Sequence, residues 1–216
     1  MDVLLDSVWL AFGRHEVLRG AHLRLRAGEI TGMLGRNGTG KSCLLKIMIG
    51  QLRADNAYLG VGGVHTASLY HHPGLINYLP QFSCHPPDLR LSRITELYGV
   101  DPRAFVERHG KLFGRSDPVF GSLSGGEKRL FEVLLTLAAD TRFTLLDEPF
   151  SHIMPVHLAS IKDGIRRVRG RKGVLITDHQ YEHVLELADT LYVVHRGTSS
   201  VVTERDDLVR LGYLKG

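Results

Sequence analysis

The sequence predicts an α/β domain with a mostly parallel sheet, because short apolar runs alternate with helical or loop-like stretches. Buried parallel strands are expected at 30–34, 143–147, 173–177 and 190–194. The beginning of the chain differs, with antiparallel strands and turns expected at 2–12, 21–28 and 56–65. Residues 82–123 read as irregular and then helical, which predicts a helical subdomain inserted at about 82–133. A last hairpin is expected over 190–204, turning around Gly197.

The length of 216 residues allows one sizeable domain or two small ones, and the composition is that of an ordinary globular protein. We expect a single domain over residues 1–216. The net charge of +4 is too small to indicate nucleic-acid binding, so no nucleic-acid partner is expected. No apolar run approaches the roughly 20 residues that span a bilayer. Two cysteines give neither a disulfide framework nor metal-ligand spacing. These features predict a cytoplasmic protein, and a role at a membrane would require a partner chain that spans it.

The first functional motif follows the expected strand 30–34 and precedes an expected helix near Lys41. The segment matches the pattern G-x-x-x-x-G-K-[ST], in which bare backbone amides form a nest for phosphate. Lys41 would reach the terminal phosphates and Ser42 would bind Mg²⁺. The alternative is a glycine-rich turn between core elements. The predicted phosphate-binding residues are Gly35, Arg36, Asn37, Gly38, Thr39, Gly40, Lys41, Ser42 and Cys43, and they indicate a P-loop NTPase core.

Two acidic residues end the expected strand "FTLLD". In open α/β sheets, ligands bind at the carboxyl ends of the strands. Asp147 is therefore expected to hold Mg²⁺ through its shell, and Glu148 to orient or polarise a water molecule. Many strands end in acids, so this pattern is weak alone. Together with the phosphate-binding loop it predicts hydrolysis of a nucleoside triphosphate.

The segment "SLSGGEKRL" (122–130) precedes another expected helix. An ordinary helix cap by Ser124, with Glu127 three residues later, explains part of this segment but not its glycine pair. The run Leu123, Ser124, Gly125, Gly126 and Glu127 is similar to the signature of the ATP-binding cassette (ABC) ATPases. This resemblance covers nearly the whole chain, in the order of that family.

The resemblance implies an ATPase that uses ATP and Mg²⁺, and it assigns three further residues. Phe12 corresponds to the aromatic residue that stacks on adenine, although it could equally be a core residue. Gln81, in "NYLPQF", corresponds to a glutamine that touches Mg²⁺ and the attacking water; the alternative is a buried structural glutamine. His179, in "LITDH", corresponds to a histidine that contacts the γ-phosphate; the alternative is a packed ring. Catalysis is thus assigned to Glu148, His179 and Gln81, with Ser42, Gln81 and Asp147 around the metal.

The resemblance also implies partners. In the family, two subunits pack head to tail, and Ser124, Gly125 and Gly126 of one subunit close over ATP bound to the other. We therefore expect a second ABC subunit, either identical or different, and an integral membrane transporter subunit on a separate chain. The protein would lie on the cytoplasmic face of the membrane. The short strings "YLPQ", "DEPF" and "ITDH" resemble lipopolysaccharide-export ATPases.

One element departs from the family. Met154 stands where the loop after the acidic pair usually has aspartate, and His152 replaces a small residue. This departure predicts slow hydrolysis and weak dimerisation of the isolated subunit, unless neighbouring groups such as Ser151 compensate. The alternatives to a transporter subunit are a soluble ABC ATPase of translation or DNA maintenance, a cassette that only binds ATP, and a different P-loop enzyme. A GTPase is disfavoured because the chain has no N-K-x-D run.

The segment "RRVRGRK" (166–172) has five basic residues. It is expected to be the solvated end of a helix, where cations suit the helix dipole. Contact with phosphates or anionic lipid is the alternative.

Overall fold

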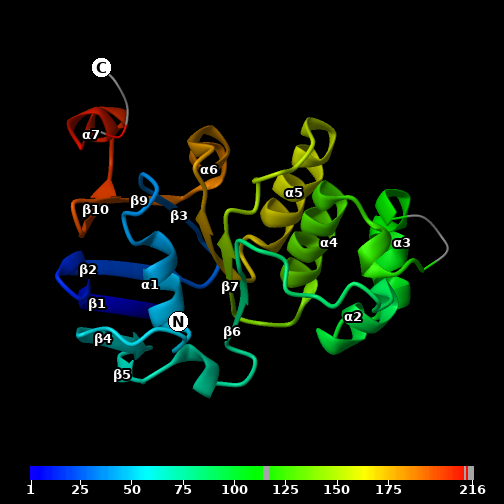
Figure 1. The fold of residues 1–216 in the computed structure, drawn as a ribbon, viewed down its shortest axis with the longest axis horizontal. Coiled ribbons are helices and arrows are strands. Elements are labelled where there is room, and N and C mark those ends of the chain that lie inside the picture. Colours follow the sequence, from blue (N-terminus) through cyan, green and yellow to red (C-terminus); the bar gives the residue numbers. More distant parts are fainter. Residues whose placement is uncertain (114–116, 212, 214–216) are drawn as a thin grey trace.

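The computed structural model describes residues 1–113, 117–211 and 213, and its strands form two sheets (Figure 1). The antiparallel sheet has the order β2-β1-β4-β5. Its strands are β1 (Asp2–Phe12), β2 (His15–Arg26), β4 (Asn56–Val61) and β5 (Val64–His65). The antiparallel N-terminal layer is therefore confirmed, although β2 starts six residues earlier than the expected strand 21–28.

The second sheet has the order β10-β9-β3-β8-β7-β6. Strands β6 to β9 and β3 are parallel, whereas β10 pairs with β9 as the predicted hairpin, turning at Arg196 and Gly197, which both have positive φ. The bounds are β3 (Ile30–Leu34), β6 (Ile76–Leu79), β7 (Phe143–Asp147), β8 (Gly173–Thr177), β9 (Thr190–His195) and β10 (Thr198–Val202). Strand β6 was not predicted, because it is a short edge strand whose middle two residues are only half-buried.

Helices cover both faces of the parallel sheet, with α1 on one face and α4, α5 and α6 on the other. The helices of the described residues are α1 (Lys41–Met48), α2 (Leu91–Leu97), α3 (Pro102–Phe113), α4 (Gly125–Ala138), α5 (Pro155–Val168), α6 (Tyr181–Leu187) and α7 (Arg205–Arg210), with 3₁₀ turns at Leu69–His71 and Phe120–Ser122. Within the described residues, none of these helices has the length and apolar character needed to cross a membrane.

Alternating side chains of the parallel sheet supply two apolar cores. In β7, Leu145 joins α1 and the antiparallel strands on one face, whereas Leu146 joins α4, α5 and α6 on the other. This alternation follows from the two-residue period of a strand. Gly32 in β3 marks the closest approach of α6, because a Cβ there would lie 2.6 Å from Cγ1 of Val184. The sheet is thus fixed between two apolar layers, and its carboxyl end is left for the site.

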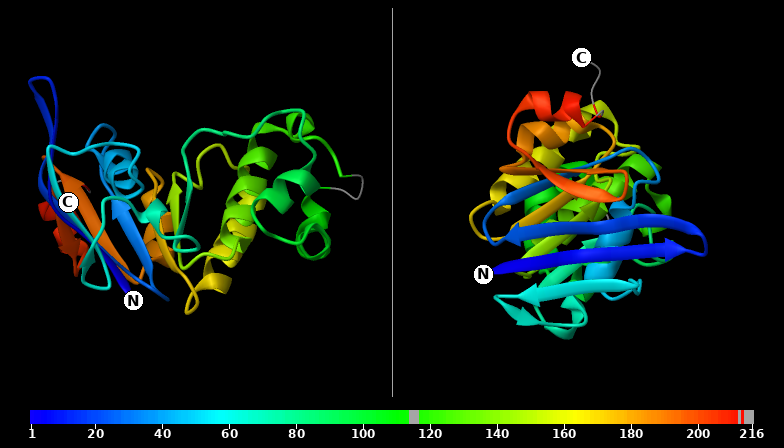
Figure 2. Two further views of the ribbon diagram at one scale, coloured as in Figure 1. Left: turned by 90° about the horizontal axis from the view of Figure 1, so that it is seen from below. Right: turned by 90° about the vertical axis from the view of Figure 1, so that its left-hand side faces the viewer.

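The helical insertion lies between β6 and β7 and forms the end of the molecule away from β1 and β2 (Figures 1 and 2). Helices α2 and α3 belong to it, and α4 carries it back to the sheet, continuing to Ala138, beyond the expected limit at residue 133. An aromatic contact joins the insertion to α4, with the Phe105 and Phe131 ring centroids 5.6 Å apart. The insertion therefore shares the core formed by α4.

The basic segment 166–172 is only partly the solvated helix end that was expected. Arg166 and Arg167 do lie in the last turn of α5. The expectation of a solvated side chain is wrong for Lys172, because its side chain is buried. Its Nζ donates hydrogen bonds to the carbonyls of Leu137 (3.2 Å) and Ala139 (2.5 Å). Lys172 thus supplies a cation to the carboxyl end of α4, where the helix dipole favours positive charge.

Lys172 predicts a distinctive pH dependence of stability. Burial lowers the pKa of its ammonium group from 10.5 to about 8. Between these values the unfolded chain binds a proton that the folded chain has released, so raising the pH favours folding. The measured quantity is the free energy of unfolding of the native protein minus that of Lys172→Met. This difference should rise between pH 8 and 9.5, with a limiting slope of about 1.4 kcal/mol per pH unit. Urea denaturation at several pH values measures this difference, and Lys46→Met, at an exposed lysine of α1, is the control. Parallel pH curves for the native protein and Lys172→Met would contradict the pKa shift.

Candidate nucleotide-binding and catalytic site

A pocket of about 560 Å³ lies at the carboxyl ends of the parallel strands, and it brings together most of the predicted site residues. The lining comes from the end of β1, the phosphate loop (residues 35–42), the start of α1 and the segments after β6, β7 and β8. The lining residues are Phe12, Val17, Asn37, Gly38, Gly40, Lys41, Ser42, Cys43, Gln81, Glu148, Ser151, His152 and His179. Phe12 is 54% exposed at this pocket, so it is not a core residue.

The phosphate loop has the backbone that its glycines were expected to allow. Gly38 and Gly40 have φ values of 80° and 100°. A Cβ at Gly40 would also lie 2.7 Å from Cδ2 of Leu18, so glycine is required there by both conformation and space. Leu44 N donates to the Gly40 carbonyl (3.0 Å), which starts α1 at the loop. The loop thus presents the amino end of a helix to the pocket, where an anion is stabilised.

Lys41 supplies the cation of the phosphate loop. Its Nζ donates hydrogen bonds to the carbonyls of Gly35 (2.7 Å) and Arg36 (3.2 Å). Burial lowers the pKa of Lys41, while the carboxylates of Glu148, Asp147 and Asp178 favour its charged form. Gly35, Arg36 and Thr39 do not themselves line the pocket, and Oγ1 of Thr39 donates to the Arg36 carbonyl (2.8 Å). These three predicted residues therefore shape the loop around Lys41.

Asp147 lies beneath the pocket at the end of β7, with 2% of its surface exposed. Its carboxylate accepts hydrogen bonds from Oγ1 of Thr177 (2.6 Å) and the hydroxyl of Tyr78 (3.2 Å). Burial and the nearby Asp147 carboxylate raise the pKa of Tyr78, which keeps that hydroxyl a donor. Asp147 is thus rigidly held and suits the predicted indirect contact with a metal ion.

The Glu148 carboxylate is the point at which the catalytic candidates converge. Its Oε2 accepts hydrogen bonds from Nε2 of Gln81 (3.0 Å) and Oγ of Ser151 (3.1 Å). Nδ1 of His179 lies 3.6 Å from the same oxygen. Glu148 has φ 53°, a left-handed conformation that is costly for a residue with a side chain. Its N–H donates to the Thr177 carbonyl (2.8 Å), which helps to hold this conformation.

Arg129, on α4, is a site residue that the sequence did not reveal. Its guanidinium donates hydrogen bonds to three backbone carbonyls, those of Pro80 (2.7 Å), Glu148 (3.1 Å) and Asp147. Arg129 is buried, and its Nη1 lies 3.8 Å from Oε2 of the buried Glu132. It thereby ties the segment before Gln81 to the strand end that carries Glu148. The position of Arg129 one turn after a helix start gave no signal of this role.

Asp178 is a second residue that was missed. It is fully buried, and burial raises the pKa of its carboxyl group. Its carboxylate accepts hydrogen bonds from the N–H groups of Phe150 (2.9 Å) and Gln180 (2.9 Å). Asp178 therefore links the loop after β7 to the loop that carries His179. The acid at the strand end in "ITDH" was the sequence signal that could have revealed Asp178.

The signature segment (residues 123–127) does not line this pocket. It begins α4 with a capping box in which Oγ of Ser124 accepts from Glu127 N (3.3 Å) and Oε2 of Glu127 accepts from Ser124 N (2.8 Å). Ser124 and Gly125 are exposed. A Cβ at Gly126 would lie 3.1 Å from the carbonyl oxygen of His152. The loop 151–154 therefore lies between the pocket and the signature segment, and it ends at Met154, the N-cap of α5.

The donor set around the pocket fits Mg²⁺ that is bound together with a phosphate ligand. The described residues include no group of three or more His, Cys, Asp and Glu side chains that could hold a metal ion. Mg²⁺ usually takes only one or two protein carboxylates and completes its shell with phosphate oxygens and water. Ser42 in the pocket and Asp147 beneath it are donors of this kind.

Comparison with known proteins gives consistent results. Residues 18–151 match the family model described as ABC transporter. The chain is 32% identical over 206 residues to the lipopolysaccharide export system ATP-binding protein LptB of Acidithiobacillus ferridurans, covering 89% of this chain and 86% of LptB. It is 31% identical over 214 residues to an uncharacterised ABC transporter ATP-binding protein of Rhizobium meliloti, covering 92% of this chain and 79% of that protein. A solved ATP-binding subunit of an ABC transporter shares the fold, with TM-score 0.82 at 18% identity over 100% of this chain and 95% of that one.

The buried contacts of Arg129 predict a large effect on stability. Arg129→Met keeps a long side chain but removes the donors to three carbonyls and the guanidinium beside Oε2 of Glu132, whose other oxygen keeps His85 and Ser83. Breaking a buried ion pair in this way costs about 3–5 kcal/mol, and urea denaturation should show a loss of that size. Adding Glu132→Gln should recover part of it. The half-buried neighbour Lys128 is the control, and Lys128→Met should change stability by no more than about 0.5 kcal/mol. Native stability in Arg129→Met would show that the guanidinium does not hold these segments together.

Proposed function

The chain belongs to the ABC transporter family of ATPases, and from this premise we propose how its residues use ATP and which partners they contact. The observation that carries the proposal is the convergence of Gln81, Ser151 and His179 on the Glu148 carboxylate, in the same pocket as Lys41. A cation for phosphate and an oriented carboxylate for water thus face one space.

ATP binding is assigned to the phosphate loop and to Phe12. The triphosphate would accept hydrogen bonds from the loop amides and from Lys41, whose Nζ would exchange the Gly35 and Arg36 carbonyls for phosphate oxygens. The exposed ring of Phe12 would stack on adenine at the other end of the pocket. Ser42 and Asp147 would hold Mg²⁺, which would neutralise charge on the phosphates.

Hydrolysis is assigned to Glu148 as the general base. A water molecule held between Glu148 and Gln81 would attack the γ-phosphorus and pass its proton to the carboxylate, while the bond to the β-phosphate oxygen breaks. The products are ADP and inorganic phosphate. His179 would donate a hydrogen bond to the γ-phosphate, and its distance from Glu148 supports a position beside the attacked group. The left-handed backbone of Glu148 supports a functional requirement for this orientation.

The exposed signature segment supports a head-to-tail dimer with a second ABC subunit. Ser124 and Gly125 would close over ATP bound to the facing subunit, because they lie outside this chain's own pocket. Each nucleotide would then join two subunits, and its hydrolysis would release them. Met154, 49% exposed at the start of α5, would face the partner where the family places an aspartate.

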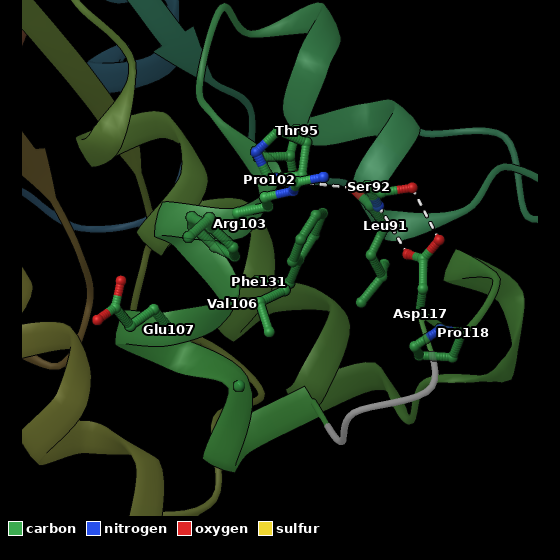
Figure 3. A pocket seen from close by; sticks show the side chains of 12 residues that line it. Leu91, Ser92, Thr95, Pro102, Arg103, Val106, Glu107, Asp117, Pro118 and Phe131 are labelled. Atoms are coloured by element: carbon green, nitrogen blue, oxygen red, sulfur yellow. Dashed lines mark hydrogen bonds between the residues drawn. The ribbon is translucent and has the colours of Figure 1, made fainter.

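A cytoplasmic helix of a membrane-spanning subunit is proposed to dock on the helical insertion. An apolar hollow of about 470 Å³ lies between α2 and α3, with Leu91, Val106 and Phe131 in its lining (Figure 3). Ser92 and Asp117 close one side of it by hydrogen bonds of 2.9 and 2.7 Å. The exposed Phe82 follows Gln81 directly, at the start of the segment that leads into the helical insertion. This position beside Gln81 supports a partner that senses the nucleotide. Such a partner would hold the ATPase on the cytoplasmic face of the membrane.

A role in lipopolysaccharide export is a narrower candidate. It is favoured by the LptB relatives, which match most of this chain at 32% and 31% identity. The membrane subunit would carry the specificity for cargo, so the identity of that subunit distinguishes this role from other transport.

Two variants separate ATP binding from hydrolysis. Lys41→Ala should abolish tight Mg-ATP binding, because the cation of the phosphate loop is removed. Glu148→Gln keeps the shape of the side chain and should retain binding, while turnover drops by about 10² or more. ATP should then trap a Glu148→Gln dimer that size-exclusion chromatography detects. Nucleotide titration and steady-state ATPase rates measure both effects. Near-native turnover in Glu148→Gln would move the role of base to another residue.

The docking surface predicts a selective loss of the membrane partner. Val106 lines the hollow and is 47% exposed, whereas Val156 on α5 is exposed elsewhere. A charge at position 106 would be buried by a docked apolar helix without compensation. Capture from detergent-solubilised membranes should therefore recover a multi-span protein with the native chain and Val156→Asp, and at least tenfold less with Val106→Asp. Recovery of ribosomes or DNA instead, or equal recovery by both variants, would reject the proposed surface.

A further inference from the structure

Four exposed arginines form a surface, here named the arginine surface, that the ATPase reaction does not use. Arg108 comes from α3, Arg167 from the end of α5, Arg142 from the residue before β7 and Arg171 from the turn before β8. They line two adjoining hollows of about 370 and about 100 Å³. The two hollows share Leu137, Ala138, Val168 and Arg171, so they form one continuous concave region.

The arginine surface differs from the basic residues beside it on α5. Arg166 pairs with Asp163 and Glu186, and Arg169 pairs with Asp189. By contrast, the side chains of Arg108, Arg142, Arg167 and Arg171 make no hydrogen bond or ion pair with any of the described residues. Asp140 is the one carboxylate in the described lining of these hollows. The region therefore has an excess of positive charge.

The four arginines are not needed to neutralise the carbonyl end of the nearby helix α4. The carbonyl end of α4 reaches the same region, but the buried Lys172 already donates to Leu137 and Ala139 there. Burial and the positive charges of Arg108 and Arg167 lower the pKa of His109 to about 4. The arginines thus affect the titration of a neighbouring side chain, and Asp140 is the one described carboxylate in the lining that offsets their charge.

We propose that the arginine surface binds a compact phosphate-bearing anion. Guanidinium groups match phosphate oxygens in pairs, and they bind phosphate more specifically than ammonium groups do. The arginines come from separate elements and converge on a concave region, which suits an anion held from several sides. A compact anion could enter the hollows that these arginines line, whereas a flat bilayer surface could not.

This site lies at the amino ends of the parallel strands, and the nucleotide pocket lies at their carboxyl ends. Arg142 and Arg171 stand at the amino ends of β7 and β8, whereas Glu148 and His179 follow the carboxyl ends of the same strands. The site is therefore separate from the phosphate loop, and the inference goes beyond the proposed function. Its test does not depend on ATP hydrolysis.

Calorimetric titration with inorganic tripolyphosphate tests the proposal, with Mg-ADP present to occupy the nucleotide pocket. The native protein should bind tripolyphosphate, and Arg108→Ala/Arg167→Ala should bind it at least tenfold more weakly. Arg166→Ala, in the last turn of α5, and Arg169→Ala, at its C-cap, are matched controls and should bind like the native protein, because those arginines are already paired. Arg108→Lys/Arg167→Lys should recover part of the affinity, since it keeps the charge but loses the paired donors. Lys41→Ala should bind tripolyphosphate undiminished.

Several results would overturn the proposal. The proposal is wrong if the native protein does not bind tripolyphosphate, or if Lys41→Ala binds it more weakly. It is also wrong if the arginine-surface variants and the controls Arg166→Ala and Arg169→Ala lose affinity equally. A second arm uses sedimentation with phosphatidylglycerol and phosphatidylcholine vesicles. Binding to phosphatidylglycerol that requires Arg108 and Arg167, without tripolyphosphate binding, would replace the compact anion with a membrane surface. Thermal denaturation of each variant verifies that the loss of binding does not come from unfolding.

Discussion

The hydrogen bonds from Arg129 to three backbone carbonyls hold the site together. A guanidinium has five donors in a fixed plane, so it can hold carbonyls from two segments at defined angles. Here those segments are the end of the stretch before Gln81 and the end of β7. The geometry of Gln81 relative to Glu148 therefore depends on a residue of α4, which also carries the signature segment. Any movement of α4 relative to the sheet must change or strain these bonds.

The other loops of the site are connected in the same way, through backbone groups. Asp178 binds the N–H of Phe150, and the His152 carbonyl lies against Gly126. The first contact joins loops that follow β8 and β7, and the second joins the loop after β7 to the start of α4. The candidate catalytic side chains are thus positioned by contacts to main-chain groups at the carboxyl end of the sheet. Such a network suits a site whose parts must move together when a second subunit or a membrane partner binds.

Much of the fold could be predicted because burial leaves a simple pattern. Strands β3, β7 and β8 are completely buried, so their apolar runs predicted their bounds correctly. The half-buried edge strand β6 and the buried Lys172 were missed, because both depend on which other elements lie beside them. Glycine spacing predicted the phosphate loop, and the acids at the end of a strand predicted Glu148, whereas Phe12, Gln81 and His179 were assigned by resemblance to a family. Arg129 had no such signal, because it holds main-chain groups from segments that are distant in sequence. Asp178 is an acid at a strand end, but its contact with the Phe150 N–H could not be predicted for the same reason.

The order of the strands has a consequence for how the chain is made. Strand β3 is synthesised early, yet it pairs with β8 on one side and β9 on the other. A nascent chain therefore exposes both edges of this apolar strand until residues 173–195 have left the ribosome. Unpaired apolar strand edges are sites of aggregation. A stalled or truncated product that ends before β8 would contain the whole phosphate loop but no partner strand beside it, and we expect such fragments to depend on chaperones or to be degraded.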